Sequence, residues 1–105
     1  MVKKLLFILF LSFSTAVFSQ KKLQKLSTAP NPFLTKTTIK FTITKSQPVI
    51  LVVRNVLGKT VFQKTYTAKV GKNLIVFNRN NLQSGMYIYA IRSSNEIISK
   101  RFVIK

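Results

Sequence analysis

The chain has 105 residues, of which 18 are lysine or arginine and only one, Glu96, is acidic, so its formal net charge is +17. It contains no histidine and no cysteine, which removes the usual ligands of zinc, haem and iron–sulfur clusters and the Ser–His–Asp and Cys–His catalytic systems. A single carboxylate cannot form the acid–base pair of a glycosidase or a calcium cage. A Ser–Lys pair at Ser99 and Lys100 is disfavoured because neighbours on a strand point to opposite faces. We therefore expect no enzyme, no catalytic residue, no cofactor, no metal and no disulfide.

The first nineteen residues have the pattern of a secretory signal peptide. Lys3 and Lys4 form a positive start, and an almost unbroken apolar run follows from Leu5 to Phe13. Small or modest side chains then precede a predicted cut between Ser19 and Gln20. The apolar run is shorter than the ~20 residues of a membrane-spanning helix, so we expect a cleavable signal helix at 1–19 and no transmembrane span after cleavage. A buried N-terminal helix is the alternative.

The next part of the chain contains two strand patterns and a proline motif. Residues 20–29 are expected to be a short linker or a first edge strand, with a strand around Leu23–Thr28. Pro30-Asn31-Pro32-Phe33 cannot sit in a helix or a central strand, and predicts an extended, stiff segment that docks Phe33 on the sheet. From Thr37 onward, apolar side chains alternate with polar ones, as expected of a half-buried strand.

Further along, Val49–Val53 is an unbroken apolar run rich in β-branched residues, which predicts a central strand covered on both faces. Asn55-Val56-Leu57-Gly58 is a turn pattern, in which Asn55 caps locally and Gly58 can take a positive φ. A polar loop at 78–85 contains Leu82, which is expected to plug the end of the core. Further strands are predicted at Thr60–Tyr66, Leu74–Phe77, Met86–Ile91 and Ile97–Ile104.

Six clear strands and a possible seventh, with turn signals every 8–13 residues or so, favour an antiparallel β-sandwich over a barrel or an α/β fold. In the last strand, Ile98, Phe102 and Ile104 are expected to bury on one face. Tyr87 is expected in the core near Leu82, in a corner where its hydroxyl bonds back to upstream main chain.

Four motifs occur in order along the chain. They are Pro30-Asn31-Pro32-Phe33, Asn55-Val56-Leu57-Gly58-Lys59, Asn81-Leu82-Gln83-Ser84-Gly85-Met86-Tyr87, and the closing Lys100-Arg101-Phe102-Val103-Ile104-Lys105. Together they resemble the type A C-terminal sorting domain of the type IX secretion system of Bacteroidetes. The resemblance begins near Leu26, and we assign 30–105 to the sorting domain. It implies a seven-stranded immunoglobulin-like sandwich.

The resemblance also implies a function. Domains of this family direct export across the outer membrane, and their partners are the type IX translocon and a sortase-like peptidase. The expected location is the periplasm in transit, then the cell surface or the extracellular space. The resemblance marks Lys100, Arg101 and Lys105 as candidate recognition residues. This chain departs from the pattern because no large cargo is expected between the signal peptide and the sorting domain.

Each motif also has a purely structural interpretation. The proline motif can simply end a linker, Gly58 and Gly85 can serve turn geometry, and the last strand can be an ordinary amphipathic one. The basic side chains are dispersed along the chain, which suits solubility better than a nucleic-acid groove. Attraction to anionic lipopolysaccharide is a second use of this charge. The alternatives to sorting are a free-standing polyanion-binding or structural module of the periplasm or surface, and a remnant of a truncated secreted protein.

Overall fold

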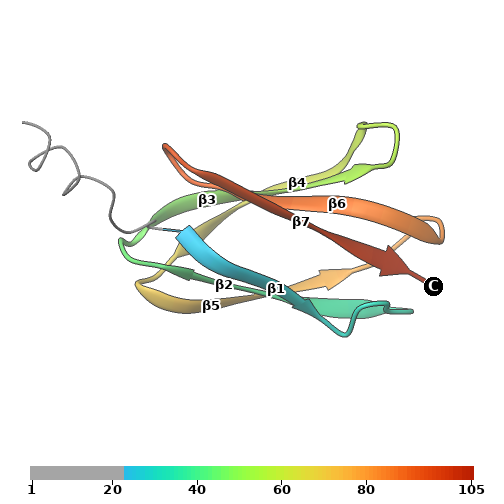
Figure 1. Cartoon of the computed structure of the whole chain (residues 1–105), viewed down its shortest axis with the longest axis horizontal. Coiled ribbons are helices and arrows are strands. Elements are labelled where there is room, and N and C mark those ends of the chain that lie inside the picture. Colours follow the sequence, from blue (N-terminus) through green and yellow to red (C-terminus); the bar gives the residue numbers. More distant parts are fainter. Residues whose placement is uncertain (1–22) are drawn as a thin grey trace, which may run out of the picture.

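The computed structural model describes residues 23–105, so the expected signal peptide and its cut between Ser19 and Gln20 lie outside the described residues. The described part consists of seven strands and contains no helix, which confirms the all-β prediction (Figure 1). The strands are β1 (Leu23–Ala29), β2 (Lys36–Ile43), β3 (Gln47–Asn55), β4 (Thr60–Ala68), β5 (Gly71–Asn78), β6 (Gly85–Arg92) and β7 (Ile97–Ile104).

The strands form two antiparallel sheets that face each other as the two layers of a sandwich (Figure 1). The smaller sheet has the order β1-β2-β5 and the larger one β4-β3-β6-β7. In a constant-type immunoglobulin domain the fourth strand lies beside the fifth. Here it pairs with the third instead, so the sandwich is immunoglobulin-like with its fourth strand moved to the larger sheet.

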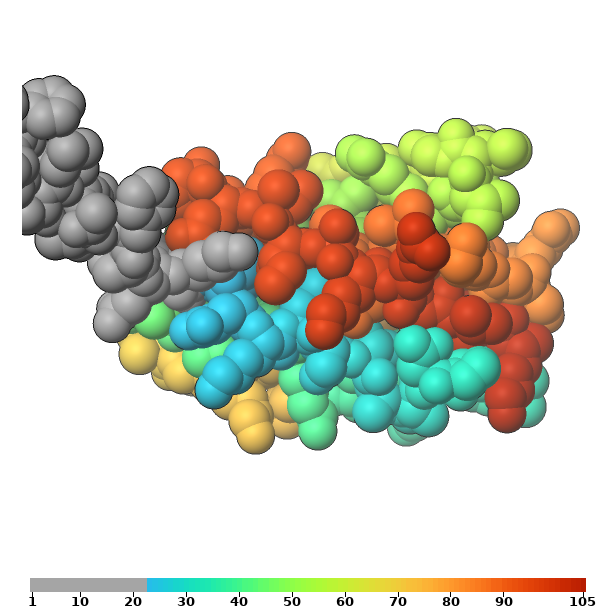
Figure 2. Space-filling model, in the orientation of Figure 1, coloured from blue at the N-terminus to red at the C-terminus, as the bar shows by residue number. Residues whose placement is uncertain are grey.

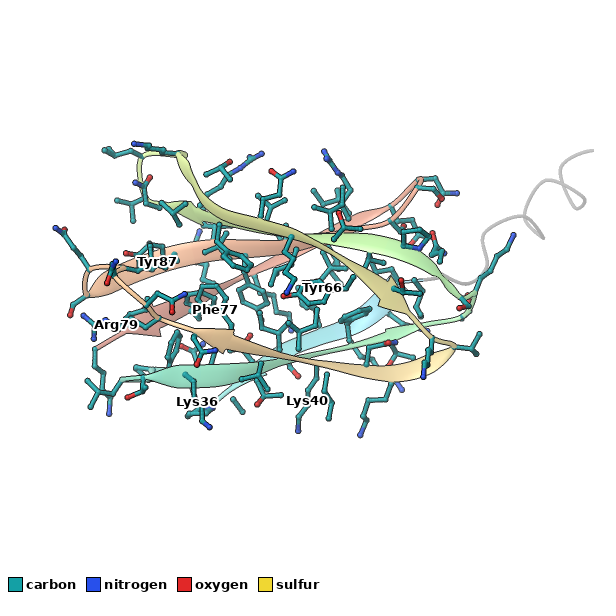
Figure 3. The ribbon with its side chains drawn as sticks, turned by 180° about the vertical axis from the view of Figure 1, so that it is seen from behind. Lys36, Lys40, Tyr66, Phe77, Arg79 and Tyr87 are labelled. Atoms are coloured by element: carbon teal, nitrogen blue, oxygen red, sulfur yellow. The ribbon has the colours of Figure 1, made fainter. Side chains whose placement is uncertain are left out.

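The alternating sequence of β2 decides which of its faces is buried. Ile39, Phe41 and Ile43 are at most 2% exposed and face the other sheet, because every second side chain of a strand points the same way. Lys36 and Lys40 point away from the sandwich (Figure 3). β2 is also the central strand of the smaller sheet, so its alternation sets the inner face of that layer.

β3 is a central strand of the larger sheet, as its apolar run predicts. Its inner row of Val49, Leu51 and Val53 is fully buried. The prediction that both faces are covered holds at Val52, which is buried with 8% of its surface exposed. It is wrong at Ile50, which is only half-buried. Among the described residues no further layer lies over that outer face, so only side chains of neighbouring strands shield it.

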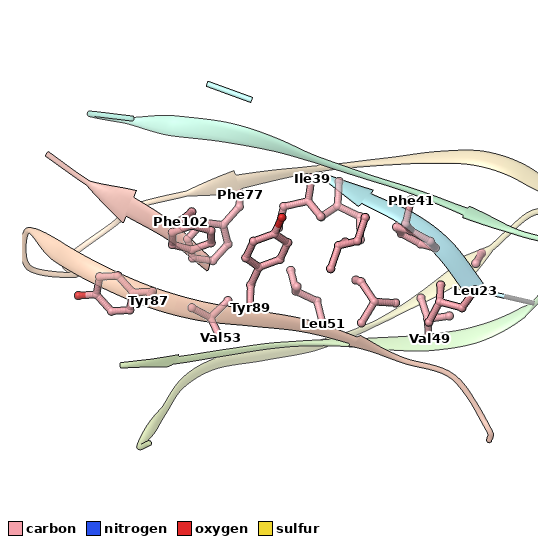
Figure 4. Close-up of a cluster of buried hydrophobic side chains, with 14 of the residues drawn as sticks. Leu23, Ile39, Phe41, Val49, Leu51, Val53, Phe77, Tyr87, Tyr89 and Phe102 are labelled. Atoms are coloured by element: carbon pink, nitrogen blue, oxygen red, sulfur yellow. The ribbon is translucent and has the colours of Figure 1, made fainter. Parts of the chain in front are cut away.

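Aromatic rings fill the end of the core nearest the finish of β7 (Figure 4). Phe102 is fully buried and its ring contacts four others: Phe33 and Tyr89 at centroid distances of 5.2 Å, Phe77 at 5.4 Å and Tyr87 at 6.0 Å. Burial raises the pKa of the Tyr89 hydroxyl, so this ring stays neutral in the core. Among the described residues, the core cluster extends from Leu23 at the start of β1 to Ile104 at the end of β7.

The last strand follows its predicted alternation only in part. Phe102 and Ile104 are buried as expected, with at most 1% of each side chain exposed. Ile98 is only half-buried, and Lys100, which occupies the inward position between Ile98 and Phe102, is exposed. The inward-facing side chains of β7 are therefore buried near the end of the strand and partly or fully exposed near its start.

We predict that Phe102→Ala lowers the free energy of unfolding by about 3–5 kcal/mol, because it leaves a cavity among four rings. Urea denaturation followed by fluorescence or circular dichroism measures this loss. Val103→Ala is the matched control, because Val103 neighbours Phe102 on the same strand and is 38% exposed on the opposite face. Equal losses in the two variants would contradict the assignment of Phe102 to the centre of the core.

Candidate functional site

The proline motif runs along the outer edge of β7. The Asn31 side chain bonds to two main-chain groups of that strand: its Nδ2 donates to Arg101 O (3.2 Å) and its Oδ1 accepts from Val103 N (2.9 Å). Phe33 continues the pairing with its own main chain, donating to Val103 O (3.0 Å) and accepting from Lys105 N (2.8 Å). Four hydrogen bonds therefore occupy main-chain groups in the second half of β7 and at Lys105, of the kind that an edge strand normally leaves free.

The prediction of an extended segment at Pro30–Phe33 is wrong. The peptide bonds before Pro30 and Pro32 are both cis, and the chain bends at residues 30–32. Because of these bends, the segment meets β7 through one side chain and one short parallel bridge, not as a regular strand. Phe33 is docked in the core with 2% of its surface exposed. In Figure 2 the end of β7, in red, lies against the cyan segment that follows β1.

The three candidate recognition residues are exposed but do not form one cluster. Arg101 pairs in register with Ile88 and points away from the core, whereas Lys100 pairs with Tyr89 and occupies an inward position. Lys105 follows β7 and is held by its main chain. The structure thus brings the main chain of Arg101 and Lys105 to the proline motif and leaves the side chain of Lys100 on the other face.

The position of Lys100 has a structural explanation of its own. A lysine that points inward on an edge strand obstructs pairing with another sheet edge. The opposite edge strand, β4, has a lysine in the same situation: Lys64 pairs with the inward-facing Leu51, is exposed, and has its amine 5.3 Å from the centre of the Tyr66 ring. Lysines at inward positions on both edges of the larger sheet therefore discourage sheet-to-sheet association.

Arg79 joins three segments at the same end of the sandwich, and the sequence analysis missed it. Its guanidinium donates from Nη1 to Lys105 O (2.8 Å) and Leu34 O (3.3 Å), from Nε to Leu82 O (2.9 Å) and from Nη2 to Ser84 Oγ (3.1 Å). Figure 3 shows Arg79 at the Tyr87 end of the molecule. In sequence it is one of many dispersed basic residues, and only its place in a polar loop beside Leu82 could have drawn attention to it.

The other motif residues lie in two hydrogen-bonded turns. Asn55 Oδ1 accepts hydrogen bonds from the main-chain N–H groups of Leu57 and Lys59, both at 3.0 Å, and Gly58 has a φ of +85°, a value that side-chain-bearing residues rarely adopt. Tyr87 Oη donates to Gln83 O at 2.7 Å, in a corner of the kind found in immunoglobulin-like domains.

The remaining motif residues sit around that corner. Leu82 packs partly buried against the core, and Gly85 begins β6. Among residues 23–105 there is neither a group of histidine, cysteine or carboxylate side chains that could hold a metal ion nor a helix long and apolar enough to cross a membrane.

Comparison with known proteins identifies one family. The family described as the secretion system C-terminal sorting domain matches residues 27–105, which extends from the second half of β1 through β7 and Lys105. No curated protein matches the chain. The matched stretch contains the proline motif, the edge of β7 to which that motif bonds, both turns and Arg79.

We predict that Asn31→Ala frees Arg101 O and Val103 N and lowers the free energy of unfolding by about 1–2 kcal/mol, since two net hydrogen bonds are lost. Hydrogen exchange provides the local measurement: exchange of the Val103 amide should accelerate while that of Val53, in the centre of the sheet, follows only the global change. Asn95→Ala, at an exposed turn, is the matched control. If Val103 exchanged no faster than in the control, the proline motif would not be what closes this edge.

We also predict that Arg79→Lys lowers the free energy of unfolding by about 1.5–3 kcal/mol, because one ammonium cannot replace a planar guanidinium that bonds to four oxygens. Chemical denaturation of this variant is compared with that of Arg92→Lys, which makes the same chemical change at an exposed position on β6. Similar stabilities for the two variants would show that the Arg79 contacts contribute little.

Proposed function

The chain belongs to the secretion system C-terminal sorting domain family, and we propose that it is a non-enzymatic module that directs export through the type IX secretion system across the outer membrane. Its partners in this role are the type IX translocon and its sortase-like peptidase, and its destination is the cell surface or the extracellular space. The observation that carries the proposal is the extent of the family match, which includes nearly all of the described sandwich.

The geometry supports recognition of side chains on a folded domain. Asn31 and Phe33 occupy Arg101 O, the N–H and C=O groups of Val103, and Lys105 N, so a partner cannot add a strand there without displacing them. The side chains of Lys100, Arg101 and Lys105 remain exposed. We therefore assign sorting recognition to these side chains and place their support in the proline motif and Arg79.

The proposed organisation is a signal peptide at 1–19, a short connection at 20–29 that contains β1, and a sorting domain at 30–105. The larger part of the positive charge lies outside the proposed recognition residues, because lysines and arginines occur in every strand. This distribution separates the sorting proposal from general polyanion binding, in which each charge contributes wherever it lies.

The test is a reporter with its own signal peptide, followed by residues 20–105, in a host that has a type IX system. We expect the wild-type fusion to reach the surface and Lys100→Gln with Lys105→Gln to leave it in the periplasm. The melting temperature should change little, because exposed charges contribute about 0–1 kcal/mol to folding. Surface labelling and thermal unfolding of the same variants measure the two effects together.

The control variant, Lys64→Gln with Lys69→Gln, removes the same charge from β4 and the turn that follows it. It should be exported normally. Loss of export in both variants, in proportion to net charge, would favour a polyanion-binding module. A wild-type fusion that never leaves the periplasm would contradict the sorting proposal itself.

A further inference from the structure

The outer faces of the two sheets are both basic, but they carry different basic side chains. The exposed bases on the outer face of the smaller sheet are lysines: Lys36 and Lys40 on β2, and Lys72 on β5. On the larger sheet they are Arg54, Arg92 and Arg101. The chain has 14 lysines and only four arginines, and the fourth, Arg79, is engaged at the end of the sandwich. Three of four arginines therefore share one face.

The strand register places these arginines among apolar side chains. Across β3, β6 and β7 the outward-facing positions form successive rows, because residues paired across antiparallel strands lie on the same face. The rows are Ile50-Arg92-Ile97, Val52-Ala90-Ser99, Arg54-Ile88-Arg101 and, on β6 and β7 alone, Met86-Val103. We call these eleven residues the arginine face. No lysine occupies an outward position on the four strands of this sheet.

The arginine face is hollowed near its middle. A shallow pocket of about 130 Å³ is lined by Val52, Arg54, Ile88, Ala90, Arg92, Ile97 and Ser99. Most of its lining is apolar, and its two arginines, Arg92 and Arg54, belong to the rows on either side of the Val52-Ala90 row. Ile97, on its rim, is 65% exposed, so a large apolar side chain there has no cover within the described chain. Such a hollow fits a small apolar side chain flanked by carboxylates.

The chemistry of arginine favours a protein partner over a membrane. Guanidinium is weakly hydrated and bonds carboxylates through two parallel N–H groups, and arginine is enriched in protein interfaces from which lysine is depleted. An anionic lipid surface attracts lysine and arginine about equally, so it would be served as well by the lysines of the opposite face.

A second copy of this chain does not fit the arginine face. Two such faces would bring arginines against arginines, and the chain has only one acidic residue, Glu96. Glu96 is engaged within the molecule, where its Oε2 accepts a hydrogen bond from Leu23 N at 3.1 Å. The complementary charge must therefore come from a different molecule.

We propose that the arginine face is the docking surface for an acidic, partly apolar patch on a protein of the export machinery. This proposal rests on the sorting function and identifies the chemistry of its receptor. Strand spacings give the face about 400 Å², roughly half of one side of a stable interface. An interface of that size is transient, as the passage of an exported protein requires.

The experiment compares two variants that keep every positive charge. Arg54→Lys with Arg101→Lys changes the arginine face, and Lys36→Arg with Lys40→Arg makes the reverse change on the opposite face. Purified residues 20–105 are titrated against two probes, a random copolymer of glutamate and tyrosine and vesicles of phosphatidylcholine with phosphatidylglycerol. Reporter fusions of the same variants are tested for surface delivery, and their melting temperatures are measured.

We expect the arginine-to-lysine variant to bind the copolymer about tenfold more weakly and to lose surface delivery, because the bidentate carboxylate bonds are lost. Its vesicle binding and melting temperature should equal those of the wild type, and the reverse variant should behave as the wild type throughout. Ile97→Gln should also weaken copolymer binding without affecting vesicle binding.

Three outcomes would overturn the proposal. The first is undiminished copolymer binding by the arginine-to-lysine variant. The second is a drop in its vesicle binding as large as the drop in its copolymer binding, which would indicate a membrane partner. The third is normal surface delivery of that variant when the wild type is also delivered. If the wild-type fusion fails to reach the surface while the copolymer contrast holds, the sorting function is wrong and the arginine face remains a site for acidic protein.

Discussion

The Asn31 amide makes with β7 the two hydrogen bonds that a neighbouring strand would otherwise make, and Phe33 adds two more from its main chain. An edge strand without such partners offers its free N–H and C=O groups to other chains. Phe102 lies between the two bonded residues Arg101 and Val103 and is buried among the core rings, whereas the Arg101 side chain faces solvent. Stability of the sandwich, protection of its edge and display of its surface therefore depend on one set of contacts.

Most of the fold could be predicted because β2 alternates polar and apolar residues, because β3 contains an unbroken apolar run rich in β-branched residues, and because turn residues separate the later strands. β1 was left open, and its geometry explains why. Leu23 and Leu26 are both buried although they stand three residues apart, because the pairing with β2 shifts between Gln24 and Ser27. Lys25, inside this shift, has a φ of +59°. An irregularity of this kind removes the period on which strand prediction depends.

The candidate site was less predictable because its contacts join side chains to distant main-chain atoms. Asn31 reaches groups that lie 70 and 72 residues further along the chain, and Arg79 reaches the carbonyl oxygen of Lys105. Every residue has a main-chain carbonyl oxygen, so the sequence does not indicate which one a side chain will bond to. The separation of arginines from lysines was hidden for a related reason: it emerges only when the register of β3, β6 and β7 aligns positions far apart in sequence.

The long span between the proline motif and β7 also sets the order of events during synthesis and translocation. A chain that emerges from a ribosome or a channel with its N-terminus first presents Asn31 and Phe33 long before Val103 exists to bind them. Contacts between residues so far apart in sequence form late in folding. Only when they form do they offset the entropy lost in closing the intervening loop. The sandwich therefore closes after the residues of β7 have emerged, and a folded domain is itself a signal that this stretch of the chain has arrived intact.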